Sequence, residues 1–155
     1  MKFLCDEMLK GMARWLRAAG YDVSVAADGM SDFTLLQLAK KEGRTLLTRD
    51  RRFFQSLNDT ADIVLLECND QDACFREISN KVGVDWLHKP FTRCLACNTV
   101  LLEAPAQDWD KMPPQSRAKA TRLLICPKCR QLFWDGSHVK KMKDILESAS
   151  RHATA

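Results

Sequence analysis

The sequence predicts an α/β domain that is followed by a small zinc ribbon. Up to about residue 90, short apolar runs alternate with segments of helical periodicity, which is typical of a mostly parallel sheet with helices on both faces. Beyond that point, pairs of cysteines and scattered aromatic residues replace the alternation. We therefore expect an α/β domain over residues 1–90 and a four-cysteine zinc ribbon with a C-terminal helix over residues 91–155.

Four strands and five helices are expected from the apolar pattern. The strands are Lys2–Cys5, Asp22–Ala26, Arg44–Thr48 and Asp62–Leu66. Apolar residues at three- and four-residue spacing, such as Leu9, Met12 and Leu16, predict helices. The helices are Met8–Ala19, a segment between a Ser31 cap and a Gly43 terminator, a short one ending near Leu57, about Asp70–Lys81 and about Val139–Ser148.

The composition excludes several classes of protein. With 155 residues, of which 46% are hydrophobic and 28% charged, the chain is globular and not disordered. No apolar run approaches the ~20 residues of a membrane helix. Asp6 and Glu7 interrupt the apolar N-terminal stretch, so it is not a signal peptide. These features favour a cytoplasmic protein with no membrane partner.

Positive charge is concentrated in the second part of the chain. Residues 1–90 hold 13 Lys or Arg and 14 Asp or Glu, a net charge of −1, whereas residues 91–155 hold 11 and 6, a net charge of +5. This asymmetry favours a polyanionic partner. A solvated basic surface would give the same counts.

Four of the seven cysteines form two CxxC pairs with the spacing of a zinc site. Cys94, Cys97, Cys126 and Cys129 can supply four thiolates to one tetrahedral ion, which leaves no open position for chemistry and makes the zinc structural. A redox motif needs one such pair and not two. The odd number of cysteines and the absence of an export signal argue against disulfides, so we expect Cys5, Cys68 and Cys74 to be small buried hydrophobic residues.

Aspartates follow two of the expected strands. Asp6 and Asp50 each lie directly after a strand and before a helix, where ligand sites form in parallel sheets, and Asp32 lies in the first turn of another helix. Clustered carboxylates repel one another unless a cation neutralises them, and oxygen ligands suit Mg²⁺ or Mn²⁺. Each aspartate could instead cap a helix, which the spacing alone favours, and the two roles are compatible.

Basic residues are expected beside these carboxylates. Lys10, Arg14 and Arg17 share one face of the helix that follows Asp6, and Arg49 precedes Asp50. Such cations could hold a nucleic-acid backbone. They could also form a solvated stripe that pairs with nearby acids.

Three segments together resemble one known family along about residues 1–147. They are FLCDEMLKGMARWLRAAGYD, SDFTLLQLAKKEGRTLLTRD, and the two cysteine pairs ending in CPKC with FWDGSH. The chain resembles the Mut7-C RNase domain family, a PIN-like nuclease domain fused to a zinc ribbon. The resemblance implies a nuclease that acts on RNA with Mg²⁺ or Mn²⁺. It matches Asp6, Asp32 and Asp50 to the acidic positions, Arg14 and Arg17 to the RWLR segment, and the four paired cysteines to the zinc ligands.

The resulting hypothesis is a metal-dependent ribonuclease in which clustered aspartates hold the divalent ion and the zinc ribbon helps to hold single-stranded RNA. The alternatives are a non-catalytic RNA- or ribosome-binding adaptor and a protein-binding module. Asp70 or Asp72 could supply a fourth acid, although helix capping is favoured for both. His138 could take part in the reaction, and Phe133 and Trp134 could stack on bases or fill the ribbon's core.

Overall fold

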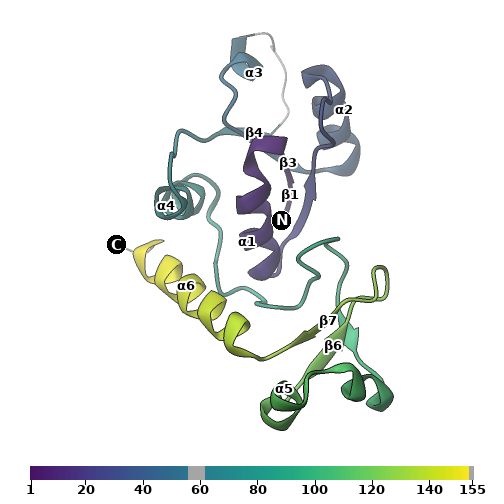
Figure 1. Ribbon diagram of the computed structural model, residues 1–155. Helices are drawn as coiled ribbons and strands as arrows, with labels where there is room; N and C mark the ends of the chain where they lie inside the picture. Colours follow the sequence, from purple (N-terminus) through teal and green to yellow (C-terminus); the bar gives the residue numbers. More distant parts are fainter. Residues whose placement is uncertain (56–61, 154–155) are drawn as a thin grey trace.

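A four-stranded parallel sheet forms the centre of the first part of the chain. The computed structural model describes residues 1–55 and 62–153. The strands are β1 (Lys2–Cys5), β2 (Asp22–Val25), β3 (Thr45–Thr48) and β4 (Ile63–Leu65), in the order β2-β1-β3-β4 (Figure 1). All four predicted strands are confirmed, each within one residue of its predicted ends.

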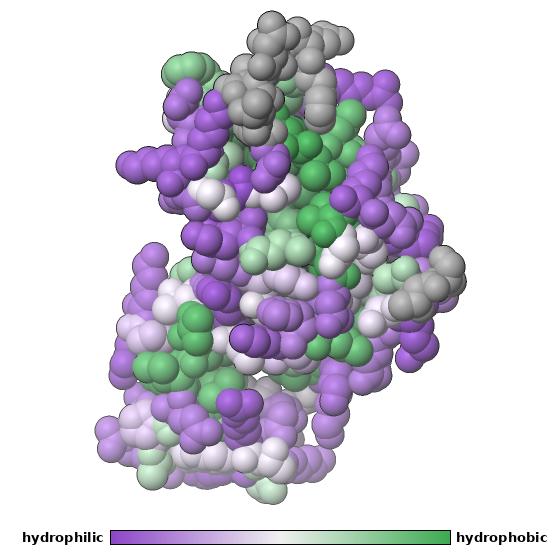
Figure 2. Space-filling model, turned by 180° about the vertical axis from the view of Figure 1, so that it is seen from behind, coloured by the Kyte–Doolittle hydropathy of each residue, from purple (hydrophilic) through white to green (hydrophobic). Residues whose placement is uncertain are grey.

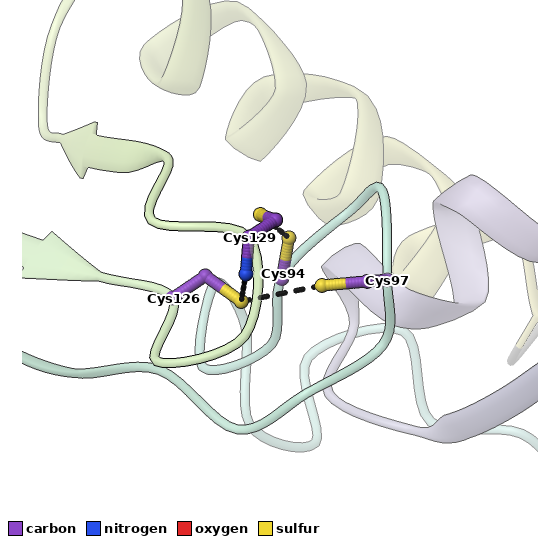
Figure 3. A group of neighbouring side chains, drawn as sticks. All are labelled: Cys94, Cys97, Cys126 and Cys129. Atoms are coloured by element: carbon purple, nitrogen blue, oxygen red, sulfur yellow. Dashed lines mark hydrogen bonds between the residues drawn. The ribbon is translucent and has the colours of Figure 1, made fainter.

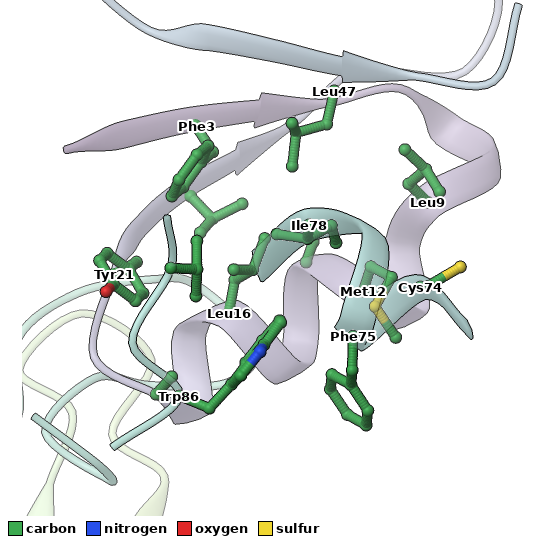
Figure 4. Packing of buried hydrophobic residues seen from close by; sticks show 14 of the residues in the cluster. Phe3, Leu9, Met12, Leu16, Tyr21, Leu47, Cys74, Phe75, Ile78 and Trp86 are labelled. Atoms are coloured by element: carbon green, nitrogen blue, oxygen red, sulfur yellow. The ribbon is translucent and has the colours of Figure 1, made fainter. Parts of the chain in front are cut away.

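Helices cover both faces of this sheet, as predicted. They are η1 (Glu7–Leu9, a 3₁₀ turn), α1 (Lys10–Ala18), α2 (Asp32–Glu42), α3 (Arg52–Gln55) and α4 (Gln71–Val82). Alternating side chains of β1 separate two layers: Phe3 and Cys5 pack with α1 and α4, whereas Leu4 packs with α2. Figure 4 shows the larger core around Leu16, with Trp86 closing it from the loop after α4. The predicted helix end near Leu57 lies outside the described residues.

Local signals explain where α2 begins and ends. The Ser31 side chain accepts a hydrogen bond from the Thr34 N–H at 3.2 Å, and Gly43 ends the helix at φ 64°. Ser31 and not Asp32 is therefore the cap of α2. No helix within the described residues combines the length and apolar character needed to cross a membrane.

The C-terminal helix α6 (Ser137–Ala153) returns to the α/β part of the molecule. Its buried residues Met142, Leu146 and Ala149 belong to the same hydrophobic cluster as Phe75, and α6 lies beside α4 (Figure 1). The helix is longer at both ends than predicted. The division of the chain at residue 90 stays a prediction, and the structure adds that residues from both sides of it share one core.

The second part of the chain contains a small antiparallel sheet of three strands, together with the two turns that carry the paired cysteines. The elements are β5 (Leu102–Glu103), η2 (Ala106–Lys111), α5 (Pro114–Lys119), β6 (Leu123–Ile125) and β7 (Leu132–Trp134), with strand order β5-β6-β7. Its core consists of Cys94, Leu101, Leu124 and Cys126, against which Phe133 packs. Such a small apolar core is typical of domains that a bound metal stabilises.

Hydrogen bonds fasten this second sheet to the edge of the first. Arg17 of α1 donates from Nη1 to the Leu95 carbonyl at 3.0 Å. Asn98 donates from Nδ2 to Asp22 Oδ1 at 2.6 Å, and its Oδ1 accepts from the Val23 N–H at 2.9 Å. Because β2 is an edge strand, Asn98 satisfies a backbone group that would otherwise be unpaired.

The expectation for Cys68 and Cys74 is wrong in one respect. Both residues are buried, but they are joined by a disulfide across the start of α4. Asp70 caps this helix, and the tight turn before it brings the two Cα atoms to 5.1 Å although the residues are six positions apart. Cys5 is confirmed as a free, buried residue whose pKa is raised to about 12, chiefly by burial.

Candidate functional site

The four paired cysteines converge on one point. Their sulfur atoms all lie within 4.8 Å of one another (Figure 3). The distance between the sulfurs is 3.7 Å for Cys94 and Cys129 and 3.2 Å for Cys97 and Cys126. Tetrahedral zinc with Zn–S bonds of about 2.3 Å needs sulfurs about 3.8 Å apart. The cluster therefore fits a structural zinc ion.

Two matching turns build this cluster. After each pair the chain reverses through a residue in the left-handed region, Asn98 at φ 68° and Arg130 at φ 67°. The Asn98 N–H donates to the Cys94 carbonyl and the Arg130 N–H to the Cys126 carbonyl, each at 2.9 Å. The Cys129 N–H points at the Cys126 sulfur at 3.4 Å, as backbone groups do around zinc-bound thiolates.

The thiols of the first pair differ in acidity. Burial raises the pKa of Cys94 to about 12. Burial also opposes ionisation of Cys97, but hydrogen bonds from Cys126 and Thr99 outweigh it and lower the pKa of Cys97 to about 6. Metal ligation needs both of these groups as thiolates.

Asp6 and Asp50 lie at the carboxyl ends of the neighbouring strands β1 and β3, and Thr48 connects them. The Asp6 carboxylate accepts from the Met8 N–H at 3.0 Å, the Thr48 hydroxyl at 2.6 Å and the Arg49 N–H at 3.3 Å. The Thr48 Oγ1 in turn accepts from the Asp50 N–H at 3.0 Å. Thr48 is fully buried, so these bonds fix the two aspartates relative to each other.

Arg52 occupies both carboxylate oxygens of Asp50. Its Nε lies 3.0 and 3.2 Å from Oδ1 and Oδ2, and its Nη2 lies 2.8 Å from Oδ2. Hydrogen bonds from the Arg52 guanidinium, and then from its backbone N–H, hold the pKa of the Asp50 carboxyl below its usual range. This ion pair is open to water at Arg52, whose side chain is 79% exposed, so another cation could replace the guanidinium.

Asp32 stands apart from this pair. It is exposed at the start of α2, and its negative charge raises the pKa of Arg52, after the larger contribution of Asp50. Over residues 1–55 and 62–153, the four cysteines are the only group of three or more His, Cys, Asp or Glu whose ligand atoms lie within 4.8 Å of one another. The structure thus links the Asp6 carboxylate to the Asp50 backbone through Thr48, and it does not close the three carboxylates on one point. The oxygen donors themselves suit Mg²⁺ or Mn²⁺.

Three of the predicted basic residues have a partner at the surface or inside the protein. Lys10 pairs with Asp28 at 3.0 Å, and Arg14 Nη2 lies 3.4 Å from Nε2 of His138. Both basic residues are exposed. Arg17 is different: besides the Leu95 carbonyl, its guanidinium reaches backbone oxygens of β2 and of the first cysteine turn.

Arg49 faces a small cavity next to the carboxylates. The cavity has a volume of about 190 Å³ and lies between the start of α1, the end of β3 and the start of α4. The Nε atom of Arg49 is buried without a hydrogen-bond partner among the described residues, and its Nη2 lies 3.4 Å from the Cys74 sulfur. Asp70 lines the same cavity but caps α4, and Asp72 is exposed in the first turn of α4.

The sequence alone did not identify Thr48 as part of this site. A polar residue at the end of a buried strand, directly before Arg49 and Asp50, is a signal that could have identified Thr48. Arg52 is one of the basic residues that flank Asp50 in the sequence, but its bidentate contact with Asp50 could not be predicted because it depends on the turn that begins α3.

Comparison with known proteins assigns the chain to a family. The profile of the Mut7-C RNAse domain matches residues 1–146. A human protein named exonuclease mut-7 homolog is 29% identical over 232 aligned positions, which cover 96% of this chain and 26% of the human protein. This chain therefore spans about a quarter of that relative, and no solved structure matches it. The chain belongs to the Mut7-C RNAse domain family.

Proposed function

We propose that this chain is a metal-dependent ribonuclease that hydrolyses RNA phosphodiester bonds. The observation that carries the proposal is the pair of aspartates at the ends of two adjacent parallel strands, joined through buried Thr48, in a member of an RNAse family. The human relative's name, exonuclease mut-7 homolog, supports a nuclease activity as well. A cytoplasmic location stays a prediction from the sequence.

Asp6 and Asp50 would hold the divalent ion, with Asp32 completing the site from α2. When bound, Mg²⁺ or Mn²⁺ would activate water and stabilise negative charge on the phosphate. Thr48 keeps one oxygen of Asp6 oriented, and Arg52 keeps Asp50 ionised until the metal arrives. Two of the three donors to Asp6 come from Thr48 at the end of β3 and from Arg49, the residue after it, so the buried sheet positions this carboxylate.

Lys10, Arg14 and Arg49 are the residues we propose for phosphate contacts. Lys10 and Arg14 are exposed on one face of α1, and the orphaned Nε of Arg49 is a donor in need of an acceptor. For Arg17 we propose a positioning role, since its guanidinium donates to backbone carbonyls inside the protein. Contacts to phosphate make the affinity for single-stranded RNA strongly dependent on salt.

The test is cleavage of labelled single-stranded RNA by the wild type and by Asp50→Asn, with and without Mn²⁺. Metal is omitted and not chelated, because a chelator would also remove zinc. We expect cleavage only with Mn²⁺, and a loss of at least roughly 100-fold in the variant, more than the loss of an outer hydrogen-bond partner usually costs. Zinc content is measured for every protein.

Asp62→Asn is the matched control, because it removes one exposed acid at the opposite end of the sheet. This variant should cleave like the wild type. Equal cleavage by wild type and Asp50→Asn, or cleavage without added metal, would exclude the proposed site.

The alternative function is a non-catalytic RNA-binding adaptor. The ion pair of Arg52 with both oxygens of Asp50 favours it, since a structural salt bridge would leave no place for a metal. An adaptor would bind RNA equally well as wild type and as Asp50→Asn, and would cleave in neither form.

A further inference from the structure

A second and larger groove lies between the zinc ribbon, α6 and α1. Its volume is about 840 Å³, and its lining is mostly apolar. Three aromatic residues line it, Phe91, Phe133 and Trp134, and each is half-buried, so each keeps a surface that a ligand can reach. On the face in Figure 2, a hydrophobic patch interrupts the hydrophilic surface of the lower part of the molecule, which holds the ribbon.

Positive charge surrounds this apolar lining. Arg14 reaches the groove from α1, Arg122 from the start of β6 and Lys143 from α6, and all three are exposed. Asp135 is the acid among the lining residues that the structure describes. Its carboxylate accepts hydrogen bonds from the Thr121 hydroxyl and from the N–H groups of Thr121 and Arg122, so it is committed to the turn before β6.

Trp134 lies close to the turn that leads into α6. A Cβ atom at Gly136 would lie 2.9 Å from the indole Nε1, so the absence of a side chain there lets the ring lie against the turn that leads into α6. A held indole loses little conformational entropy when a base stacks on it. Aromatic surfaces between cations are the combination that binds single-stranded nucleic acid without reading its sequence.

We propose that this groove binds the bases of single-stranded RNA, with Trp134 as the stacking surface and Arg14, Arg122 and Lys143 along the backbone. The proposal deepens the proposed function and rests on it for the choice of RNA as ligand. An apolar peptide would also fit the lining, but three exposed cations, and no uncommitted carboxylate among the described lining residues, favour a polyanion.

Helix α1 connects the groove with the chain segment that carries Asp6. Arg14 lines the groove, and Lys10 lies one turn earlier on the same face, about 6 Å closer to the end where Asp6 opens η1. One RNA strand of a few nucleotides can therefore run from Trp134 past Arg14 and Lys10 to the aspartates. The zinc ribbon then holds the substrate on one side of the bond that is cut.

The test measures binding and not cleavage, by fluorescence anisotropy of a labelled oligouridine without Mg²⁺ or Mn²⁺. We expect Trp134→Leu to weaken binding roughly tenfold, and Trp134→Phe to restore it because phenylalanine also stacks. Lys143→Gln should make the RNA affinity less dependent on salt, by the equivalent of about one phosphate contact. Lys141→Gln, on the same helix but outside the groove, should leave this salt dependence unchanged. Zinc content and thermal melting confirm that each variant is folded.

Two further measurements separate this proposal from the proposed function. Bis(p-nitrophenyl) phosphate is too small to reach the groove from the carboxylates, so Trp134→Leu should hydrolyse it like the wild type. If neither the wild type nor the variant hydrolyses this compound, but the variants change RNA binding as expected, the proposed nuclease activity is contradicted and RNA binding by the groove is still supported. Equal affinity for duplex and single-stranded RNA would contradict base stacking in the groove. Unchanged RNA affinity in Trp134→Leu and Lys143→Gln would show that the groove does not bind RNA and would favour an apolar peptide as its ligand.

Discussion

At the scale of single residues, Thr48 is the side chain on which the geometry of the aspartates depends. It is fully buried, donates to Asp6 and accepts from the Asp50 N–H. In Thr48→Val, which keeps the shape, Asp6 loses a donor and the Asp50 N–H loses its acceptor. We expect a loss of about 1–3 kcal/mol in the free energy of unfolding, measured with urea. We also expect a roughly 10- to 100-fold loss of Mn²⁺-dependent cleavage.

Thr48→Ser keeps the hydroxyl and serves as the control. It should retain most of the cleavage activity, although it loses a methyl group from the core. If serine and valine reduce cleavage equally, Thr48 acts through packing and not by orienting Asp6.

Residue types predicted part of the site and missed the rest. The four cysteines could be assigned because CxxC spacing alone brings two thiolates to one ion. Asp6 and Asp50 were expected near each other from their places after parallel strands. The structure shows that β1 and β3 are neighbours, and the joint role of the two carboxylates stays a prediction. Arg17 could not be separated from its neighbours on α1, because its internal partners Leu95 and Ala96 are nearly eighty residues away in sequence.

At the scale of elements, the turn between α1 and β2 decides how the linker to the zinc ribbon packs. Gly20 has φ 102°, and a Cβ there would lie 2.4 Å from the Lys89 carbonyl oxygen. The Lys89 N–H in turn donates to the Ala19 carbonyl at 2.9 Å. Gly20→Ala would force this linker off the end of α1. We expect it to lower the free energy of unfolding by at least about 2 kcal/mol in urea titrations.

Gly11, at the other end of α1, is the matched control. A Cβ at Gly11 would meet no atom within 4 Å, and the residue lies in the first turn of α1. Gly11→Ala should therefore raise the free energy of unfolding by about 0.5–1 kcal/mol. If both substitutions changed the free energy of unfolding in the same direction, the proposed role of the Lys89 contact would be contradicted.

The strands and helices themselves were largely predictable, since each is marked by a local signal such as the Ser31 cap or the Gly43 terminator. The disulfide was not. Pairing of Cys68 with Cys74 depends on the turn that Asp70 imposes before α4, and an odd number of cysteines gives no hint of it.

At the scale of the whole molecule, Asp22 joins the sheet to the zinc ribbon and makes stability depend on pH. Its Oδ1 accepts from Arg44 at 2.8 Å and from Asn98 at 2.6 Å. Burial opposes ionisation, but these hydrogen bonds outweigh it and hold the pKa of Asp22 below its usual range. The lowered pKa means that its contribution to stability is present above the unfolded value of about 3.9 and is lost as pH falls through the folded pKa.

Asp22→Asn should therefore be less stable than the wild type by about 2 kcal/mol near neutral pH. The difference should shrink towards zero in acid, because the wild-type carboxyl is then neutral as well. Urea unfolding of both proteins across this range provides the measurement. Asp144→Asn, an exposed acid on α6, should differ from the wild type by a small and constant amount. If Asp22→Asn were less stable than the wild type by the same amount at every pH, the pH dependence would not come from ionisation of Asp22.

The return of α6 to the first core has a consequence for the order in which the protein can fold during synthesis. Met142, Leu146 and Ala149 lie over a hundred positions after Phe3 and share its cluster. The ribosome releases the sheet strands long before these residues, so the nascent chain exposes part of its apolar core until the last helix has emerged. Contacts between such distant segments also slow folding, because the intervening loop must close first. Newly made chains would therefore be most prone to aggregate before α6 has emerged from the ribosome.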